Sequence, residues 1–188
     1  HLKRAKKFFE SKYKRASRNI SYTPKKKIRV GYFSADFRKH AVMYLIKGLF
    51  ELHNKEQFDI YIYSMNSKED ELTDELKKNV NIFRNISDLS DENAVCIARE
   101  DSLDIAVDLM GYTKNMRLSI FSLRVAPIQI SYLGYPGSTG AECIDYLISD
   151  KIIIPDKFKK FYSEKVIYMP NCYQCNDNNR KTSKKEFR

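Results

Sequence analysis

The stretch Lys27-Ile-Arg-Val-Gly-Tyr-Phe-Ser-Ala-Asp-Phe-Arg-Lys-His40 decides the fold class of this chain. Apolar side chains alternate along its first half, at Ile28, Val30 and Tyr32, which predicts a β-strand that runs into a polar loop. A helical spacing follows at once, carried by Met43, Ile46, Leu49, Phe50 and His53. The unit is therefore strand, loop, helix. Its polar cluster falls at the carboxyl end of the strand, where open α/β sheets bind ligands, and consists of Asp36, Arg38, Lys39 and His40.

The same alternation of strand and helix continues along the chain. We predict the most secure strands at residues 28–33, 58–64, 104–109 and 127–133, with shorter ones at 81–86, 145–149 and 165–169. Helical segments at 69–80, 90–100 and 115–123 separate them, the second of them capped by Ser90. Strands joined by helices form parallel βαβ units, so residues 28–170 predict an α/β domain with a doubly wound, mostly parallel sheet.

The N-terminal segment predicts an amphipathic helix at residues 1–16. Its apolar stripe, formed by Leu2, Ala5, Phe9, Tyr13 and Ala16, needs a partner surface, so we expect the helix to pack on a neighbour. Residues 17–27, with Pro24, predict a linker, and residues 171–188 a polar tail. The chain begins without Met, and we expect it to be part of a longer protein.

The charge distribution argues against a nucleic-acid-binding protein, although the net charge is +10. The two ends, residues 1–27 and 180–188, hold sixteen of the 34 Lys and Arg but only two of the 24 acids, so the body is mildly acidic. A nucleic-acid groove needs its positive charge on the folded surface. No apolar run is long enough to span a bilayer, and the first residues lack the apolar middle of a signal peptide, so we expect a cytoplasmic protein that is not bound to a membrane.

The cysteines give no metal site. Cys96 and Cys143 stand in apolar settings, and we predict that both are small buried side chains. Cys172 and Cys175 have the spacing of a zinc or redox pair, but further ligands and a following helix are missing. We predict neither a metal nor a cofactor.

His40 is the strongest candidate for a catalytic residue. Of the three histidines, His1 is terminal and His53 ends a helix, so His40 alone follows a strand. The neighbouring cations Arg38 and Lys39 favour a neutral imidazole that can accept a proton. The alternative is a surface histidine without function. Asp36 has two open interpretations, a cap for the following helix or a residue that orients His40.

The loop Gly134-Tyr-Pro-Gly-Ser-Thr-Gly140 is the second candidate. Its glycines and proline fix a tight path whose N–H groups could cradle a polar or anionic ligand. The loop has neither the Lys of a P-loop nor a G-x-G-x-x-G pattern, so a nucleotide phosphate is not indicated. A purely structural turn is the alternative.

Five motifs in order resemble the protein O-linked N-acetylglucosamine transferase family, in a form similar to its bacterial-type members: Arg29–His40, Val107–Thr113, Arg124–Gln129, Leu133–Gly140 and Tyr173–Asp177. Residues 1–16 look like the last helix of the tetratricopeptide array that precedes the catalytic region in that family. The resemblance implies the first lobe of a two-lobed glycosyltransferase-B fold, whose second lobe holds most of the UDP-sugar contacts. Positions 108 and 110 depart from the vertebrate members, which carry Asn where this chain has Asp and Met.

The resemblance also implies a function and a set of site residues. The function is transfer of N-acetylglucosamine or a related sugar from a UDP-sugar to Ser or Thr hydroxyls of a protein acceptor, with this chain inactive on its own. His40 matches a histidine once proposed as the catalytic base, Asp36 and Asp108 are supporting residues, and the cleft is bordered by Tyr112, Thr113, Gly134, Tyr135, Pro136 and Gly137. A non-catalytic scaffold of the same fold that binds proteins is the alternative function.

Overall fold

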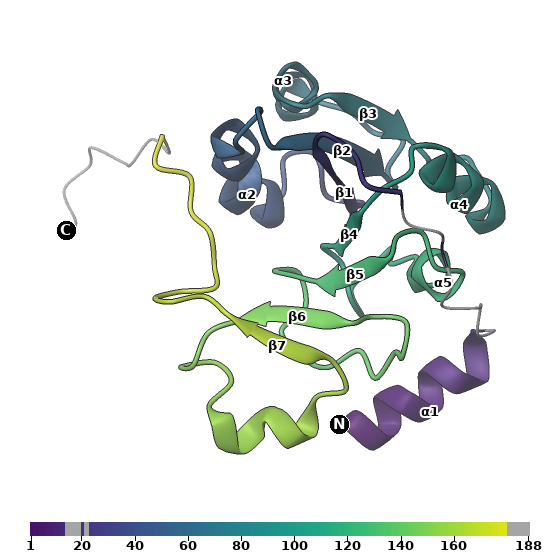
Figure 1. Ribbon diagram of the computed structural model, residues 1–188, viewed down its shortest axis with the longest axis vertical. Helices are drawn as coiled ribbons and strands as arrows, with labels where there is room; N and C mark the ends of the chain where they lie inside the picture. The colour runs from purple at the N-terminus through teal and green to yellow at the C-terminus, as the bar shows by residue number, and fades with distance from the viewer. Residues whose placement is uncertain (14–19, 21–22, 180–188) are drawn as a thin grey trace, which may run out of the picture.

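The computed structural model describes residues 1–13, 20 and 23–179. Seven strands form one sheet in the order β3-β2-β1-β4-β5-β6-β7, and all neighbours are parallel (Figure 1). The strands are β1 (Ile28–Ser34), β2 (Phe58–Ser64), β3 (Ile82–Asn85), β4 (Ile105–Asp108), β5 (Ile128–Ser131), β6 (Tyr146–Ser149) and β7 (Lys165–Tyr168). The chain winds outward from β1 in one direction and from β4 in the other. The predicted doubly wound parallel sheet is confirmed, and its strand order reverses between β1 and β4.

Helices cover both faces of the sheet. They are α1 (Leu2–Lys12), α2 (Ala41–Leu52), α3 (Glu71–Asn79), α4 (Asp91–Glu100), α5 (Leu118–Ser122) and the 3-10 helix η1 (Asp156–Phe161). Met43, Ile46 and Phe50 of α2 pack on one face of the sheet, while Ala94 and Ala98 of α4 pack on the other. Figure 1 shows α2 and α4 on opposite sides of the strands, as expected for a doubly wound sheet.

Helix caps explain where the predicted boundaries were too wide. The Asp70 carboxylate accepts hydrogen bonds from the N–H groups of Leu72 and Thr73, so α3 begins at Glu71 and not at residue 69. Ser90 caps α4 through the N–H of Asn93, as predicted. The 3-10 helix η1 was not predicted from the sequence. None of the described helices is long and apolar enough to cross a membrane.

Helix α1 packs on the domain, which confirms the predicted contact. Ala5 and Phe9 are buried, and Tyr13 packs against the same core as α4 and α5. Gly140, at a φ of +66°, lets the helix approach closely, because a Cβ there would lie 2.5 Å from the backbone nitrogen of Lys6. The last stripe residue, Ala16, and most of the predicted linker lie outside the described residues.

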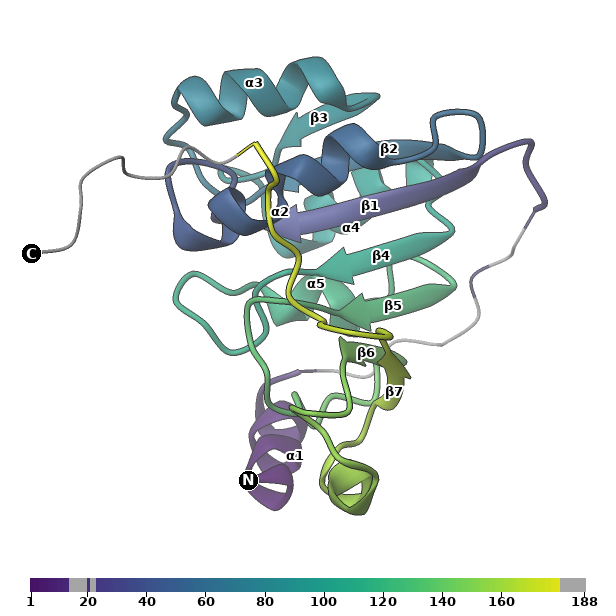
Figure 2. The same cartoon turned by 90° about the vertical axis from the view of Figure 1, so that its left-hand side faces the viewer.

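Part of the predicted polar tail packs on the domain. Tyr173 and Cys175 pack against the apolar core beneath α2, and the hydroxyl of Tyr132 donates to the Tyr173 carbonyl at 2.8 Å. Figure 2 shows this segment crossing in front of the strands on the side of α2. Residues 180–188 lie outside the described chain.

The prediction for Cys96 is wrong, because its side chain is exposed. Helix α4 turns Ala94, Val95 and Ala98 toward the sheet, which leaves Cys96 on the outer face. Cys143 is half-buried, and burial raises its pKa to about 12. The apolar neighbours of Cys96 in the sequence thus do not predict its burial, since adjacent residues of a helix point in directions about 100° apart.

Candidate functional site

A pocket of about 290 Å³ opens at the carboxyl edge of the sheet, where the strand order reverses. Loops that follow three neighbouring strands line it. Asp36, Arg38 and His40 come from the loop after β1, Thr113, Lys114 and Asn115 come from the loop after β4, and Gly134 follows β5. Open α/β sheets bind ligands in this position, so the pocket is the candidate functional site.

His40 is held at the first turn of α2. Its Nδ1 lies 3.3 Å from the backbone nitrogen of Val42, whose N–H it can accept as the N-cap of the helix. The same Nδ1 lies 3.4 Å from Oδ2 of Asp36. His40 therefore caps the helix itself, and Asp36 contacts the imidazole. Of the two interpretations of Asp36, the geometry favours the one in which it orients His40.

The two contacts of Nδ1 exclude each other. When Nδ1 accepts the N–H of Val42, the proton of a neutral ring is on Nε2, and the ring can only donate from Nε2. When Nδ1 carries the proton and faces Asp36, Nε2 has a free lone pair that can accept a proton. The side chain of His40 is 40% exposed, so the ring has access to solvent and to a substrate in the pocket.

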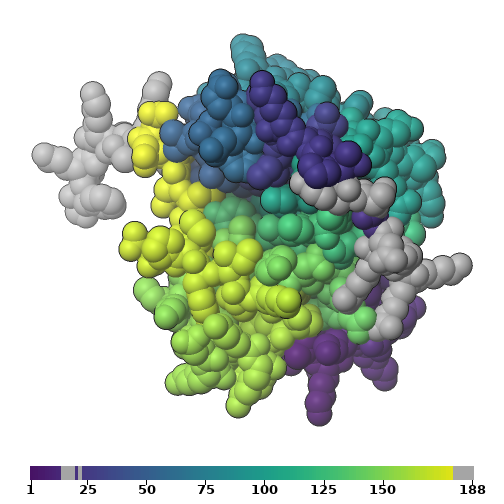
Figure 3. All heavy atoms as spheres, viewed as in Figure 1, coloured from purple at the N-terminus to yellow at the C-terminus, as the bar shows by residue number. Residues whose placement is uncertain are grey.

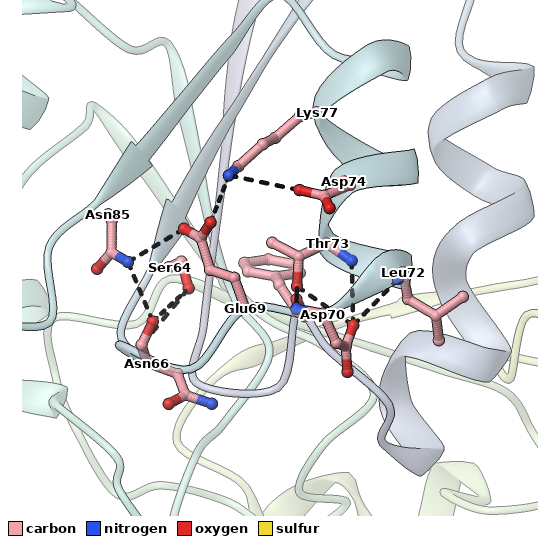
Figure 4. A network of polar contacts seen from close by, with 10 residues as sticks. Ser64, Asn66, Glu69, Asp70, Leu72, Thr73, Asp74, Lys77 and Asn85 are labelled. Atoms are coloured by element: carbon pink, nitrogen blue, oxygen red, sulfur yellow. Dashed lines mark hydrogen bonds and ion pairs between the residues drawn. The ribbon is translucent and has the colours of Figure 1, made fainter.

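Figure 4 shows the capping network at the start of α3, in which Asp70 accepts the N–H groups of Leu72 and Thr73. Asp70 and Thr73 also hold the loop that carries His40. Thr73 donates its hydroxyl to the carbonyl of Phe37 at 2.7 Å, and Asp70 accepts the N–H of Lys39 at 2.6 Å. The ammonium of Lys39 forms an ion pair with Glu71, and the guanidinium of Arg38 lies 4.0 Å from Asp36. Both cations that precede His40 in the sequence thus have carboxylate neighbours.

Asp108 lies behind the pocket wall and not in the pocket. It is 2% exposed, and its carboxylate accepts the N–H groups of Met110 at 2.9 Å and Gly111 at 3.0 Å. Burial raises the pKa of Asp108 to about 6, against the opposing effect of these two hydrogen bonds. The carboxylate fixes the turn that places Thr113 in the pocket.

Two of the predicted cleft residues point toward α1. The Tyr112 ring packs edge-on against Phe8 at 5.4 Å and against Tyr135 at 5.7 Å, and its hydroxyl donates to the carbonyl of Thr139 at 2.6 Å. The hydroxyl of Tyr135 lies 3.1 Å from Nε2 of His1. Of the predicted border residues, Thr113 and Gly134 line the pocket, whereas Tyr112, Tyr135, Pro136 and Gly137 are not among its lining residues.

Several hydrogen-bonding groups of the loop at residues 134–140 have partners within the protein. Buried Glu164, which was not predicted, accepts the hydroxyl of Ser138 at 2.7 Å, the N–H of Thr139 at 2.7 Å and the hydroxyl of Thr139. The N–H of Gly134 donates to the Tyr132 carbonyl at 2.8 Å. A Cβ on Gly134 would lie 2.0 Å from the Leu109 carbonyl oxygen, so the close approach requires glycine. These contacts favour the structural interpretation of the loop.

The pocket contains two cations, Arg38 of the predicted polar cluster and Lys114, which was not predicted. Arg38 and Lys114 line the pocket, and the Nε of Arg38 is buried without a hydrogen-bond partner. Lys114 directly follows the predicted residue Thr113, yet no local pattern in the sequence shows which way its side chain points. Among the described residues, no group of three or more His, Cys, Asp or Glu side chains is arranged to hold a metal ion. The site can therefore combine an imidazole and a carboxylate with positive charge for an anionic group.

Comparison with known proteins gives a consistent result. The model of glycosyl transferase family 41 matches residues 2–185. Over 153 residues the chain is 37% identical to the probable UDP-N-acetylglucosamine–peptide N-acetylglucosaminyltransferase SEC of Arabidopsis thaliana, which covers 81% of this chain and 16% of that protein. The corresponding enzyme of Caenorhabditis elegans is 32% identical over 155 residues, 80% of this chain and 13% of the relative.

A solved structure shows the same fold. A mutant of the O-GlcNAc transferase from Thermobaculum terrenum superposes with a TM-score of 0.83 at 28% sequence identity, covering 92% of this chain and 33% of that one. The chain therefore spans a third or less of the length of these relatives. The match to the family model covers nearly the whole chain, so the chain belongs to glycosyl transferase family 41, and the resemblance of its motifs is confirmed.

Proposed function

We propose that this chain, as a member of glycosyl transferase family 41, forms the acceptor-side lobe of a protein O-glycosyltransferase. In the proposed reaction, a Ser or Thr hydroxyl of a protein attacks the anomeric carbon of N-acetylglucosamine or a related sugar, and the bond to UDP breaks. The observation that carries the proposal is the pocket at the reversal of strand order, which His40 and Asp36 line in a family 41 chain.

His40 is the proposed base for the acceptor hydroxyl. In that role Nδ1 carries its proton toward Asp36, and Nε2 takes the hydroxyl proton as the new bond forms. The capping arrangement, with Nδ1 accepting from Val42, gives a ring that can only position the hydroxyl by donating to it. Arg38 and Lys114 supply positive charge to the same pocket. A second lobe would supply most of the UDP contacts.

The proposal extends to the context of the lobe. Helix α1 would be the last helix of a tetratricopeptide array, a role supported by its buried face on the lobe and its exposed lysines on the other face. We also propose a cytoplasmic location, for which the four free thiols are the support. Donor and acceptor would be a UDP-sugar and a protein, with no nucleic acid or membrane involved.

A transfer assay tests the function. A protein that carries this chain and its second lobe should move radiolabelled N-acetylglucosamine from UDP onto Ser/Thr peptides, whereas residues 1–188 alone should give no product, since one lobe cannot hold both substrates. Calorimetry should show weak UDP binding to residues 1–188, and submicromolar binding would contradict the assignment of the nucleotide site to the second lobe.

The scaffold alternative draws on the internally satisfied loop at residues 134–140. If the scaffold alternative holds, the two-lobed protein binds peptides in the transfer assay but leaves them unlabelled. Labelled peptide from the two-lobed protein would exclude that alternative.

A further inference from the structure

A second and larger pocket lies at the opposite edge of the sheet from His40. Its volume is about 610 Å³, and Ile128, Tyr146 and Lys165, the first residues of β5, β6 and β7, form one wall. Leu2 and Lys6 of α1 contribute to the lining, as does Lys160 of η1. Figures 1 and 2 both show α1 and η1 at the β7 end of the molecule. The proposed transfer reaction makes no use of this pocket.

Positive charge dominates the lining. Lys6, Lys160 and Lys165 are all exposed, and the acidic lining residues are Glu142 and Asp145. Asp145 is already engaged, because its carboxylate accepts two bonds from Arg124, at 2.6 and 3.1 Å, and the N–H of Gln129 at 2.8 Å. A ligand would therefore meet more ammonium groups than available carboxylates.

The lining also includes apolar side chains. Ile128, which is 38% exposed, lines the pocket together with Pro127 and Ile144. Outside the lining, η1 also exposes Phe158 and Phe161, at 43% and 51%. A small inorganic anion would leave this apolar surface uncovered, whereas a peptide can cover it and carry acidic side chains as well. In Figure 3 the segment that contains η1 and the helix α1 meet along the lower edge of the molecule.

We propose that this pocket docks an acidic peptide segment of a partner protein, with an apolar side chain on Ile128 and carboxylates paired with Lys6, Lys160 and Lys165. Charge complementarity selects the acidic peptide. A flat anionic membrane fits less well, because the pocket is a concavity between α1 and the strand ends. Since the pocket and His40 lie at opposite edges of the sheet, docking would leave the proposed transfer site open. The inference does not depend on the transferase activity.

Fluorescence anisotropy with residues 1–188 tests the proposal. The probe is a fluorescein-labelled acidic peptide, Glu-Glu-Ile-Glu-Glu, and the matched probe replaces every Glu with Gln. The first variant changes the three pocket lysines to glutamine, Lys6→Gln, Lys160→Gln and Lys165→Gln. The control variant removes the same charge elsewhere, at the exposed residues Lys55→Gln, Lys68→Gln and Lys78→Gln.

We expect saturable binding of the acidic probe that weakens about tenfold in the pocket variant, because each exposed ion pair contributes a modest amount. The control variant should bind within about twofold of the original chain, and the amide probe should bind far more weakly. Equal losses in both variants would reduce the effect to net charge and overturn the proposal. The absence of saturable binding of the acidic probe would also overturn the proposal. The same holds if the chain binds phosphatidylserine vesicles but not the acidic peptide, and the pocket variant loses the binding to vesicles.

Discussion

The polar cluster around His40 and the polar cluster around Glu164 differ in how fully their hydrogen-bonding groups are satisfied. Glu164 is 5% exposed and receives donors from Ser138, Thr139 and Ser163. His40 is 40% exposed, and two mutually exclusive partners compete for its Nδ1. A buried carboxylate with all its bonds made holds a loop in place. A side chain with alternative partners can gain or lose a proton during a reaction. The comparison therefore separates a structural cluster from a candidate catalytic one.

The largest expected effect is the loss of the structural cluster. Glu164→Ala leaves the N–H of Thr139 and two hydroxyls without their acceptor in a buried place, and we expect the free energy of unfolding to fall by about 4 kcal/mol. Urea unfolding followed by circular dichroism measures the change. Glu164→Gln keeps one acceptor oxygen and should lose less. An Ala variant within about 1 kcal/mol of the original would show that Glu164 does not anchor the loop.

The next effect concerns Asp108, which is as buried as Glu164 but less completely bonded. Its folded-state pKa of about 6 lies above the unfolded value of about 3.9. The folded state therefore binds the proton more tightly than the unfolded state does. Below pH 4 this preference adds about 3 kcal/mol to the free energy of unfolding, and the contribution is lost as the pH rises through 6.

Unfolding curves at pH 4, 5, 6 and 7 check this prediction. Asp108→Asn should remove the decline, since the amide does not titrate, so the difference between variant and original should change with pH. Asp88→Asn, at an exposed residue, is the matched control and should leave the pH profile unaltered. A pH-independent difference for Asp108→Asn would contradict the raised pKa.

The third effect is on turnover and sharpens the proposed role of His40. In a protein with both lobes, His40→Ala should lower turnover by at least about 100-fold, the lower end of the range for acid–base catalysis. His40→Asn is the informative control, because Asn is a good N-cap and preserves the start of α2 but cannot act as a base. Near-normal turnover of the Asn variant would make His40 a capping and positioning residue.

The smallest effect tests the hydrogen bond between the two loops against which α1 packs. Tyr112→Phe removes the hydroxyl that donates to Thr139 but keeps the ring between Phe8 and Tyr135. We expect a loss of about 1 kcal/mol in the free energy of unfolding, the usual contribution of one hydrogen bond. Tyr44→Phe, at an exposed tyrosine of α2, is the control and should be neutral. A neutral Tyr112→Phe would assign the contact to ring packing alone.

The sequence by itself determined the strand and helix order, the parallel sheet and the loop that carries His40. These follow from local periodicity, because a strand turns alternate side chains to the same face and a helix every third or fourth. Local capping chemistry also located the start of α4, because Ser90 is its N-cap. The family motifs lie within single loops, so they too could be read without the fold.

Only the tertiary structure decided which loop residues share the pocket. Tyr112 and Tyr135 turn toward α1, more than 100 residues away in the sequence, while Lys114 lines the pocket with His40 and Lys39 does not. The role of Glu164 depends in the same way on a loop 25 residues earlier in the chain. Such contacts are set by how the sheet and helices pack together, and no short-range pattern in the sequence encodes the direction of a side chain that packs on a distant element.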